Sequence, residues 1–260
     1  MIMPVGFLRG YDRTELAVIS VQLLGPVQVT SPQGVIDAGP ARQRCVLAAL
    51  AVDAGHPVAA YTLIDRVWGE HPPQRARHTL DVYLSRLRSI FRRTGPAIRI
   101  VRRSGGYALD IEDGAVDMAE AEAALVRASQ RGVPTAAQCD ALESALKLWR
   151  GRPLADLQGS WADCVRDLWE QRRLDALIQW SRVRLTFGRF DAVLGGLASA
   201  TMEFPLAEPL WAARMRALVA AERRSEALVM YESARSRLAD ELGIDPGPEL
   251  TELHRALLRS

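Results

Sequence analysis

Short runs of apolar residues near the start of the chain predict β-strands. Residues 17–39, "AVISVQLLGPVQVTSPQGVIDAG", are dominated by Val, Ile and Leu, and turn-forming residues interrupt them at 25–26 and 31–34. We expect short strands between these turns. Residues 1–17 show no comparable pattern, and we predict an N-terminal extension that is either disordered or the product of a misjudged start codon.

Three helical patterns follow the strands. Apolar residues recur at helical spacing over 41–55, over 61–70 and, for longest, over 71–93. Pro72 and Pro73 suit the first turn of the third helix, because a missing N–H group costs little there.

A β-hairpin is predicted after the third helix. Residues 98–111, "IRIVRRSGGYALDI", contain two runs rich in β-branched and aromatic residues around a turn at 104–106. Three helices followed by such a hairpin are typical of a winged helix-turn-helix.

The pattern changes at about residue 117, beyond which only helices are expected. Residues 127–138 interrupt the first two of these helices. Residues 151–161 are predicted to form a loop or an irregular link. The pairs Asp191-Ala192 and Glu226-Ala227 recur 35 positions apart, close to the ~34 of tetratricopeptide helix pairs. The fold class is therefore mainly α with a small β component: a winged helix-turn-helix over 18–111 and an all-α, tetratricopeptide-like domain over 112–260.

Five tryptophans are predicted to anchor helix packing in the second domain. They are Trp149, Trp161, Trp169, Trp180 and Trp211. The alternative is a ligand pocket lined by some of them.

The third helix is amphipathic when it is projected at ~100° per residue. The predicted core face holds Leu80, Leu84, Leu87 and Phe91. The opposite face and its flank carry residues suited to contact DNA: Arg75, Arg77, His78, Thr79, Val82, Ser85, Arg86, Arg88, Ser89, Arg92 and Arg93.

Charge is concentrated around this helix. The whole chain has a net charge of only +2, but residues 71–103 hold nine arginines and a single acid, Asp81, a net charge of +8. Such asymmetry suggests a polyanion partner for one domain. The abundance of arginine over lysine also fits coding bias in a GC-rich genome.

A solvated amphipathic helix is the alternative to a DNA-reading one. Solvated helices usually mix both charge signs, which pair at i,i+4, whereas this helix has Asp81 alone. Arginine forks suit guanine, small hydroxyls adapt, and an apolar group meets the thymine methyl. We therefore favour a major-groove reader, with Arg88 and Arg92 on phosphates beside the groove.

The hairpin carries Arg102 and Arg103 beside its glycine turn. An ordinary basic hairpin is one interpretation, and a phosphate-binding nest at Gly105-Gly106 is another. After a basic helix, the better interpretation is a wing whose arginine enters a narrow, electronegative minor groove.

Other chemistry finds little support in the sequence. Three widely spaced cysteines and four histidines show no metal-ligand spacing, so no metal or cofactor is predicted. No nucleophile motif or acid–base pair indicates an enzyme. The start of the chain is a poor signal peptide, and no apolar run approaches the ~20 residues of a membrane span, so a cytoplasmic protein without a membrane partner is expected.

Several motifs in order resemble known regulators. "TLDVYLSRLR" (79–88) followed by "IVRRSGGYAL" (100–109) resembles the DNA-binding domain of OmpR-like response regulators. The whole chain resembles the Streptomyces antibiotic regulatory protein family through four further stretches. These are "VQLLGPVQV" (21–29), "ARQRCVLAALAVDAGHPV" (41–58), "ALKLWRGRPLADL" (145–157) and "RLADELGIDPGPEL" (237–250).

This resemblance implies a transcriptional activator. Its winged helix would bind double-stranded DNA at direct repeats in a promoter of a secondary-metabolite gene cluster. Its helical domain would support tandem binding with a second copy and contact RNA polymerase, including the sigma factor. Carried over by position, Arg86 would read a base with His78 and Val82 nearby. Thr79 and Arg88 would touch phosphate, and Arg103 would enter the minor groove.

Two features of these regulators are missing from the sequence. No receiver-like segment precedes the winged helix, so phosphoaspartate control is not expected. No Walker-type glycine-rich loop is found, so the chain is not expected to resemble the larger, ATP-binding members of the family. The alternative function is a protein-interaction or ligand-sensing adaptor, in which the helical domain acts and the basic helix only packs.

Overall fold

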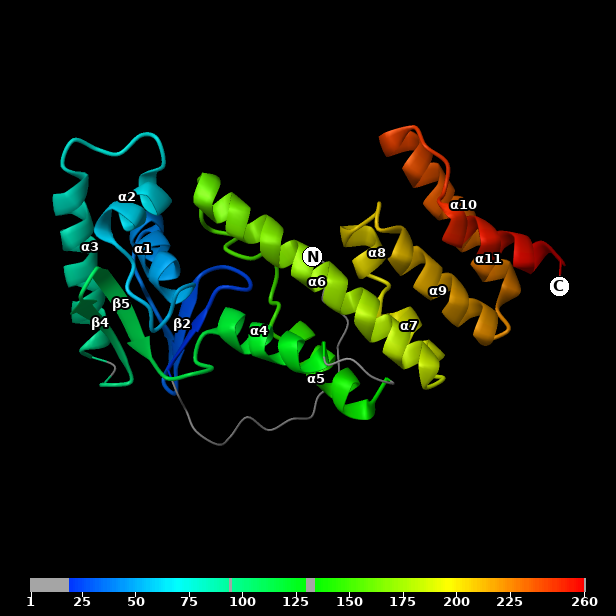
Figure 1. Ribbon diagram of the computed structural model, residues 1–260, viewed down its shortest axis with the longest axis horizontal. Helices are drawn as coiled ribbons and strands as arrows, with labels where there is room; N and C mark the ends of the chain where they lie inside the picture. The colour runs from blue at the N-terminus through cyan, green and yellow to red at the C-terminus, as the bar shows by residue number, and fades with distance from the viewer. Residues whose placement is uncertain (1–18, 94, 130–133, 260) are drawn as a thin grey trace. The chain divides into compact units, whose positions relative to one another are not determined.

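The computed structural model describes residues 19–93, 95–129 and 134–259 (Figure 1). The predicted extension over 1–17 lies outside these residues. The chain divides into two units: unit 1 comprises Met1–Ala119 with Leu154–Ala162, and unit 2 comprises Glu120–Pro153 with Asp163–Ser260. The predicted domain limits at 18–111 and 112–260 stay predictions.

A small antiparallel sheet opens unit 1, as the apolar runs predict. Its strands are β1 (Ser20–Gln22), β2 (Gln28–Ser31) and β3 (Gly34–Ile36), in that order. Val21 pairs with Val29, and Val29 pairs with Ile36. Val21 and Val29 are fully buried, so this register turns the valines of β1 and β2 toward the core.

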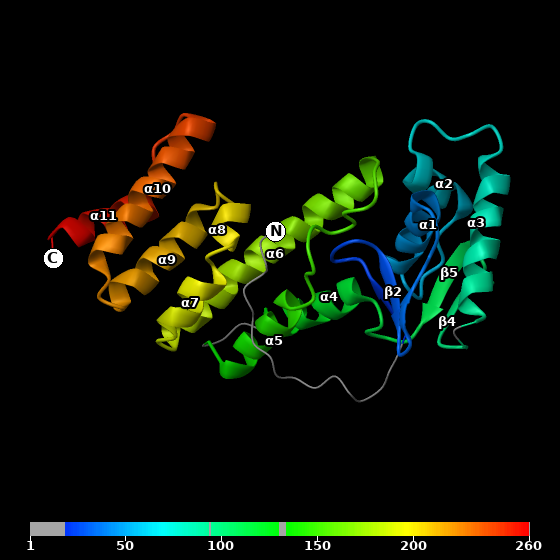
Figure 2. The ribbon, with the colours of Figure 1, turned by 180° about the vertical axis from the view of Figure 1, so that it is seen from behind.

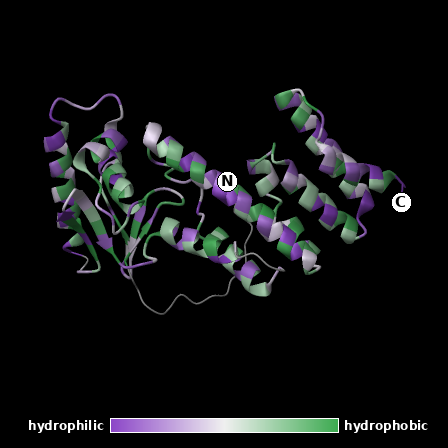
Figure 3. Cartoon of the chain, in the orientation of Figure 1, coloured by the Kyte–Doolittle hydropathy of each residue, from purple (hydrophilic) through white to green (hydrophobic). Residues whose placement is uncertain are grey.

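Three helices follow the sheet: α1 (Ala41–Ala51), α2 (Ala60–Trp68) and α3 (Ala76–Phe91). The predicted core face of α3 is confirmed, since Leu80, Leu84, Leu87 and Phe91 are at most 2% exposed. Hydrophilic and hydrophobic segments alternate along α3 in Figure 3, as expected for one buried and one solvated face.

The predicted place of Pro72 and Pro73 in the first turn of α3 is wrong. The helix begins at Ala76, whose N–H donates to the Pro73 carbonyl oxygen at 2.9 Å. Arg75, at the helix N-cap, has φ −110° and ψ 38° and is not helical. The two prolines therefore belong to the loop before α3, which ends in a turn.

The predicted hairpin is confirmed as β4 (Ile98–Arg103) and β5 (Gly106–Ile111). The antiparallel register pairs Arg103 with Gly106 across the two-residue turn Ser104-Gly105. Gly105 has φ +95°, in the left-handed region that favours glycine. The hairpin lies beside α3 in both views of the ribbon (Figures 1 and 2), and we call it the wing.

The wing is attached to the loop between α1 and α2. The Val58 N–H donates to the Tyr107 carbonyl oxygen at 2.8 Å, and the Tyr107 N–H donates to the Val58 carbonyl oxygen at 2.9 Å. A Cβ atom on Gly106 would overlap the Val58 carbonyl group. Glycine is needed at 106 because the two backbones touch there, a different reason from that at Gly105.

Residues distant in sequence hold the loop between β1 and β2. The buried Asp117 carboxylate accepts from the N–H groups of Leu23 and Leu24 at 2.7–2.9 Å. The Leu154 N–H donates to the Leu23 carbonyl oxygen at 3.0 Å. Asp156 accepts from the Val27 N–H at 2.7 Å.

The stretch 151–161 is irregular up to α6, as predicted, but part of it belongs to unit 1. Asp156 accepts from Arg44 Nε at 2.6 Å. The guanidinium of Arg66 lies 5.6 Å from the ring centroid of Trp161. The prediction that Trp161 anchors the second domain is therefore wrong, because its aromatic face meets a helix of unit 1.

Unit 2 is built from helices, two of which, α4 and α6, begin in unit 1. Their bounds are α4 (Asp117–Ala128), α5 (Ala136–Leu146), α6 (Ser160–Thr186), α7 (Phe190–Gly196), α8 (Ala200–Glu203), α9 (Glu208–Ala220), α10 (Arg224–Leu242) and α11 (Pro248–Arg259). Trp149, Trp169, Trp180 and Trp211 are buried, as predicted. Trp180 Nε1 donates to Glu143 at 2.8 Å and so joins α6 to α5.

The helical repeat has a different register from the predicted one. Helices α7 and α10 begin 34 positions apart, and the residues before them, Arg189 and Arg223, have nearly the same backbone angles. Val193 then corresponds to Ala227, and both are fully buried. Ala192, which the sequence pairs with Ala227, is exposed. The period of 34 residues is that of tetratricopeptide repeats. The pairs Asp191-Ala192 and Glu226-Ala227 are not at equivalent positions in this repeat.

Replacement of Gly106 by alanine should destabilise unit 1 by about 2–3 kcal/mol, because backbone must shift to admit the Cβ atom. Gly105→Ala is the matched control: it has open space but a left-handed φ, and should cost about 1 kcal/mol. Urea unfolding followed by circular dichroism measures both. Equal losses would show that the contact with Val58 does not constrain the wing.

Removal of the Asp156 carboxylate should destabilise unit 1 by about 1–3 kcal/mol, because the Val27 N–H and Arg44 both lose an acceptor. Asp113→Ala, at an exposed acid, is the control. The same urea unfolding compares Asp156→Ala with it. A midpoint for Asp156→Ala no lower than for the control would show that the Asp156 carboxylate does not stabilise unit 1.

Candidate nucleic-acid interface

Eleven predicted DNA-contacting residues lie on α3 or directly beside its two ends. They differ in how far their side chains are exposed. Arg75, Arg77, His78, Ser85, Arg86, Arg92 and Arg93 are exposed, and Thr79, Val82, Arg88 and Ser89 are half-buried. The burial of Leu84 and Leu87 on the other side leaves Arg86 pointing away from the core. The helix thus presents a basic surface with one apolar side chain, Val82.

The wing places Arg102 and Arg103, the two arginines beside its turn, on opposite faces of the hairpin. Arg102 is opposite Tyr107 and Arg103 is opposite Gly106 in the register, and neighbouring residues of a strand alternate in direction. Both arginines are exposed. Arg103 lies 4.0 Å from Asp110, which also pairs with Arg99 at 2.8 Å. An exposed pair as long as 4.0 Å leaves the Arg103 guanidinium available to another anion.

Two arginines of α3 have partners within unit 1. Arg88 Nε donates to the Ile100 carbonyl oxygen at 2.9 Å, and its guanidinium lies 5.7 Å from the Tyr107 ring centroid. Arg77 Nε lies 3.7 Å from Asp81. These side chains contribute to the basic surface and also connect α3 to the wing.

The hydroxyl of Thr79 also has a partner. Its Oγ1 donates to the Arg75 carbonyl oxygen at 3.1 Å. The proton is therefore used within the helix. Donation from this hydroxyl to a phosphate would require it to leave the Arg75 carbonyl oxygen.

Sequence reasoning missed the residue that joins these groups. Tyr107 is 5% exposed, and its hydroxyl donates to Asp81 Oδ1 at 3.0 Å. The signals were present in the sequence: an acid alone on a basic helix and a tyrosine after a glycine pair. Only the packing of the wing on α3 shows that they meet.

Other reactive groups do not form a site in the described residues. Burial raises the pKa of the Cys45 thiol to about 11 and also raises the pKa of Cys139, so neither thiol supplies a thiolate at neutral pH. No cluster of three or more His, Cys, Asp or Glu side chains able to hold a metal ion occurs in this part of the chain. Among the helices described, none combines the length and the apolar character that crossing a membrane would require.

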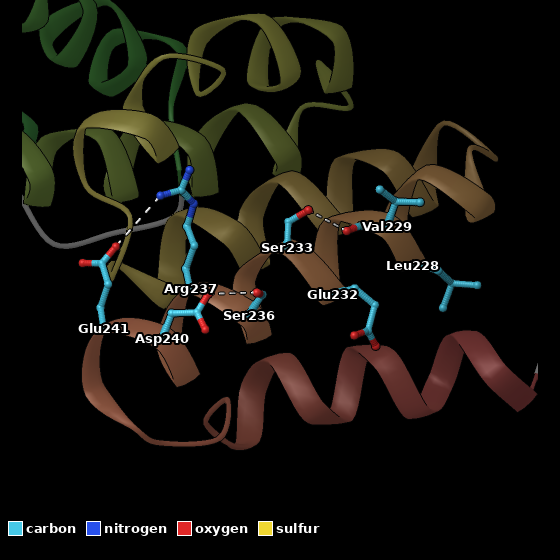
Figure 4. A pocket seen from close by; sticks show the side chains of 8 residues that line it. All are labelled: Leu228, Val229, Glu232, Ser233, Ser236, Arg237, Asp240 and Glu241. Atoms are coloured by element: carbon cyan, nitrogen blue, oxygen red, sulfur yellow. Dashed lines mark hydrogen bonds and ion pairs between the residues drawn. The ribbon is translucent and has the colours of Figure 1, made fainter.

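An open groove of about 790 Å³ runs along α10 (Figure 4). Its polar side chains interact along their own helix. Arg237 lies 3.9 Å from Glu241, Ser236 Oγ donates to Asp240 at 3.2 Å, and Ser233 Oγ donates to the Val229 carbonyl oxygen at 2.9 Å. Groups paired in this way are typical of a solvated helix face, and the groove offers less to a ligand than α3 offers to DNA.

Two family models match the chain. The model described as "Transcriptional regulatory protein, C terminal" matches residues 38–109, and the one described as "Bacterial transcriptional activator domain" matches residues 116–258. The first match contains α1–α3 and most of the wing, and the second contains the helices of unit 2.

Several curated proteins are similar to the chain over most of its length. Regulatory protein AfsR of Streptomyces griseus is 35% identical over 92% of this chain, which spans 24% of that protein. Regulatory protein DnrI of Streptomyces peucetius is 33% identical, with 93% of each protein covered. The chain therefore spans about a quarter of the AfsR proteins it matches but nearly all of DnrI.

A solved structure is also similar over most of this chain. Mycobacterium tuberculosis EmbR, in complex with a low-affinity phosphopeptide, superposes with a TM-score of 0.79 at 31% identity, covering 93% of this chain and 65% of that one. Together with the two family models and the relatives, this similarity confirms the fold class and the resemblance noted in the sequence. The chain belongs to the Streptomyces antibiotic regulatory protein family of transcriptional activators.

Proposed function

We propose that the chain is a cytoplasmic, non-enzymatic activator that binds promoter DNA in a sequence-specific manner and recruits RNA polymerase. α3 enters the major groove, the wing enters the neighbouring minor groove, and unit 2 contacts the polymerase, including its sigma factor. The observation that carries the proposal is the solvent side of α3, where exposed arginines surround small polar residues and Val82, with Asp81 as the single acid between residues 71 and 103.

The surface chemistry supports base reading as well as charge attraction. Exposed Arg86 can form two hydrogen bonds to guanine O6 and N7, and Val82 can meet a thymine methyl group. Exposed Arg92 and Arg93 at the end of α3 suit phosphates. Exposed Arg102 and Arg103 on the wing suit the minor groove, whose potential is most negative where it is narrow.

The target is proposed to be a direct repeat in a promoter of a secondary-metabolite gene cluster. Family membership supports this assignment, because the relatives that match are regulatory proteins of Streptomyces and Mycobacterium. Two copies of the chain would then bind head to tail. Copies spaced by one helical turn of DNA approach from the same side of the duplex.

Arg86 and Arg92 give a matched test of base reading. The DNA probe is a duplex selected from a random-sequence library by the wild-type protein, and a scrambled duplex is the comparison. Arg86→Ala should weaken binding to the selected duplex by about 1–3 kcal/mol with a smaller effect on the scrambled one. Arg92→Ala should weaken both alike and lower the log–log salt slope by about one. Arg92 is a cleaner phosphate probe than Arg88, which also bonds to the wing.

Fluorescence anisotropy over a range of salt concentrations measures these changes, with thermal melting as the folding control. If both variants lose as much affinity for the scrambled duplex as for the selected one, α3 is only a basic surface and does not read bases. Absence of a steep salt dependence for the wild type would contradict DNA binding itself and would leave the adaptor function.

Repeat spacing tests tandem binding. Two copies of the selected site with centres about 10–11 base pairs apart should bind two protein molecules cooperatively, because both approach from one side of the DNA. Insertion of a half turn between the sites should abolish cooperativity and activation in a reporter assay. Equal cooperativity on an inverted repeat would contradict the head-to-tail arrangement.

A further inference from the structure

A buried tyrosine hydroxyl lies at the junction of α3 and the wing. The Tyr107 side chain comes from β5 and is 5% exposed. Its hydroxyl donates to Asp81 Oδ1 at 3.0 Å, and Arg77 Nη2 donates to the same hydroxyl oxygen at 3.4 Å. The phenol is thus both a donor and an acceptor to α3.

Two guanidinium groups from α3 lie against the tyrosine ring. Those of Arg77 and Arg88 lie 5.9 Å and 5.7 Å from its centroid, within the range of cation–π attraction. Arg88 also donates from Nε to the Ile100 carbonyl oxygen on β4. Both strands of the wing are therefore joined to the same stretch of α3.

The backbone of Tyr107 is fixed from the other side. Its N–H and carbonyl groups both pair with Val58, in the loop between α1 and α2. Gly106 lies against the carbonyl group of Val58 and has no room for a side chain. With its backbone held in this way, the tyrosine has little freedom to follow α3 if the helix tilts.

This arrangement accounts for the acid on α3. A carboxylate on a DNA-facing helix repels phosphate and reduces non-specific affinity. The ion pair between Asp81 and Arg77 explains it poorly, because both side chains are about half exposed and 3.7 Å apart. The hydrogen bond from Tyr107 is shorter, and it joins two elements that meet DNA in different grooves.

We propose that Tyr107 and Asp81 form a latch that sets the angle between α3 and the wing, so that both fit neighbouring grooves at once. The latch rests on the proposed function for its effect on DNA. Tyr107 and Asp81 are positioning residues: they act on recognition through the placement of other side chains. Loss of the latch should therefore release the wing from the minor groove and leave the contacts of α3 in place.

Tyr107→Phe tests the latch because it keeps the ring and removes only the hydroxyl. With the selected duplex as probe, affinity should fall about 5–10-fold and hydroxyl-radical protection of the minor groove beside the wing should disappear. Methylation protection of guanine N7 in the major groove should remain. Tyr83→Phe is the matched control, since Tyr83 lies on α3 and stacks on Trp68 at 6.2 Å, away from the wing.

Variants of Asp81 give a second test, in which the affinity for DNA is expected to rise and not to fall. Asp81→Asn keeps an oxygen acceptor for the Tyr107 hydroxyl, so wing protection should be retained while affinity for the scrambled duplex rises. Asp81→Ala should also raise that affinity but lose wing protection. The double variant Tyr107→Phe/Asp81→Ala should lose no more wing protection than Asp81→Ala alone, because each change already removes the hydrogen bond between the Tyr107 hydroxyl and Asp81. Retained protection in Tyr107→Phe, or identical footprints for the two Asp81 variants, would overturn the latch.

Hydrogen exchange without DNA separates the latch from the proposed function. Amides of 98–111 should exchange faster in Tyr107→Phe and Asp81→Ala than in the wild type, Asp81→Asn or Tyr83→Phe, with melting temperatures as the folding control. Unchanged exchange would reject the latch even if the wild type binds DNA. A wild type that binds neither duplex would reject the proposed function, and the exchange rates would still decide the latch.

Discussion

The arrangement of unit 1 depends on one contact between two stretches of backbone, where β5 meets the loop between α1 and α2. Val58 and Tyr107 exchange two hydrogen bonds, and the neighbouring Gly106 leaves no room for a Cβ atom. A two-stranded hairpin by itself is marginally stable in water. This contact gives the wing a fixed support on one side, and α3 gives it a second on the other. The basic side chains on the wing and on α3 acquire a defined relation to one another as a result.

Much of the fold follows from local pattern. Leu80, Leu84, Leu87 and Phe91 repeat at helical spacing, so one face of α3 had to be buried and Arg86, on the other face, had to be exposed. The wing follows from β-branched runs around a glycine turn. The pattern predicted the start of α3 less reliably, because prolines fit both a first helical turn and a preceding loop. Pro72 and Pro73 tolerate a first helical turn but do not require one, and the turn that ends at Ala76 precedes α3 instead.

Contacts between distant residues could not be predicted from the same pattern. Asp81 and Tyr107 are 26 positions apart, and Arg44 and Asp156 are 112 apart. No periodicity relates such residues; they meet because strands and helices pack in a particular register. Repeats show the same limit. Val193 and Ala227 have different side chains but occupy equivalent buried positions in the two repeats. Ala192 has the same side chain as Ala227, yet it is exposed and therefore not equivalent. Similar burial, and not similar sequence, marks the helical repeat.

The placement of Leu154–Ala162 in unit 1 has a consequence for protein synthesis. The stretch matched by the first family model ends at residue 109, yet the loop between β1 and β2 obtains acceptors and donors from Leu154 and Asp156. A nascent chain that has emerged only as far as the wing still has the Val27 N–H and Arg44 without these partners. Fragments released early from the ribosome would therefore be less stable than the whole chain and more readily degraded. Loss of the same few hydrogen bonds would also limit the amount of any piece that carries α3 but lacks the helices after residue 162.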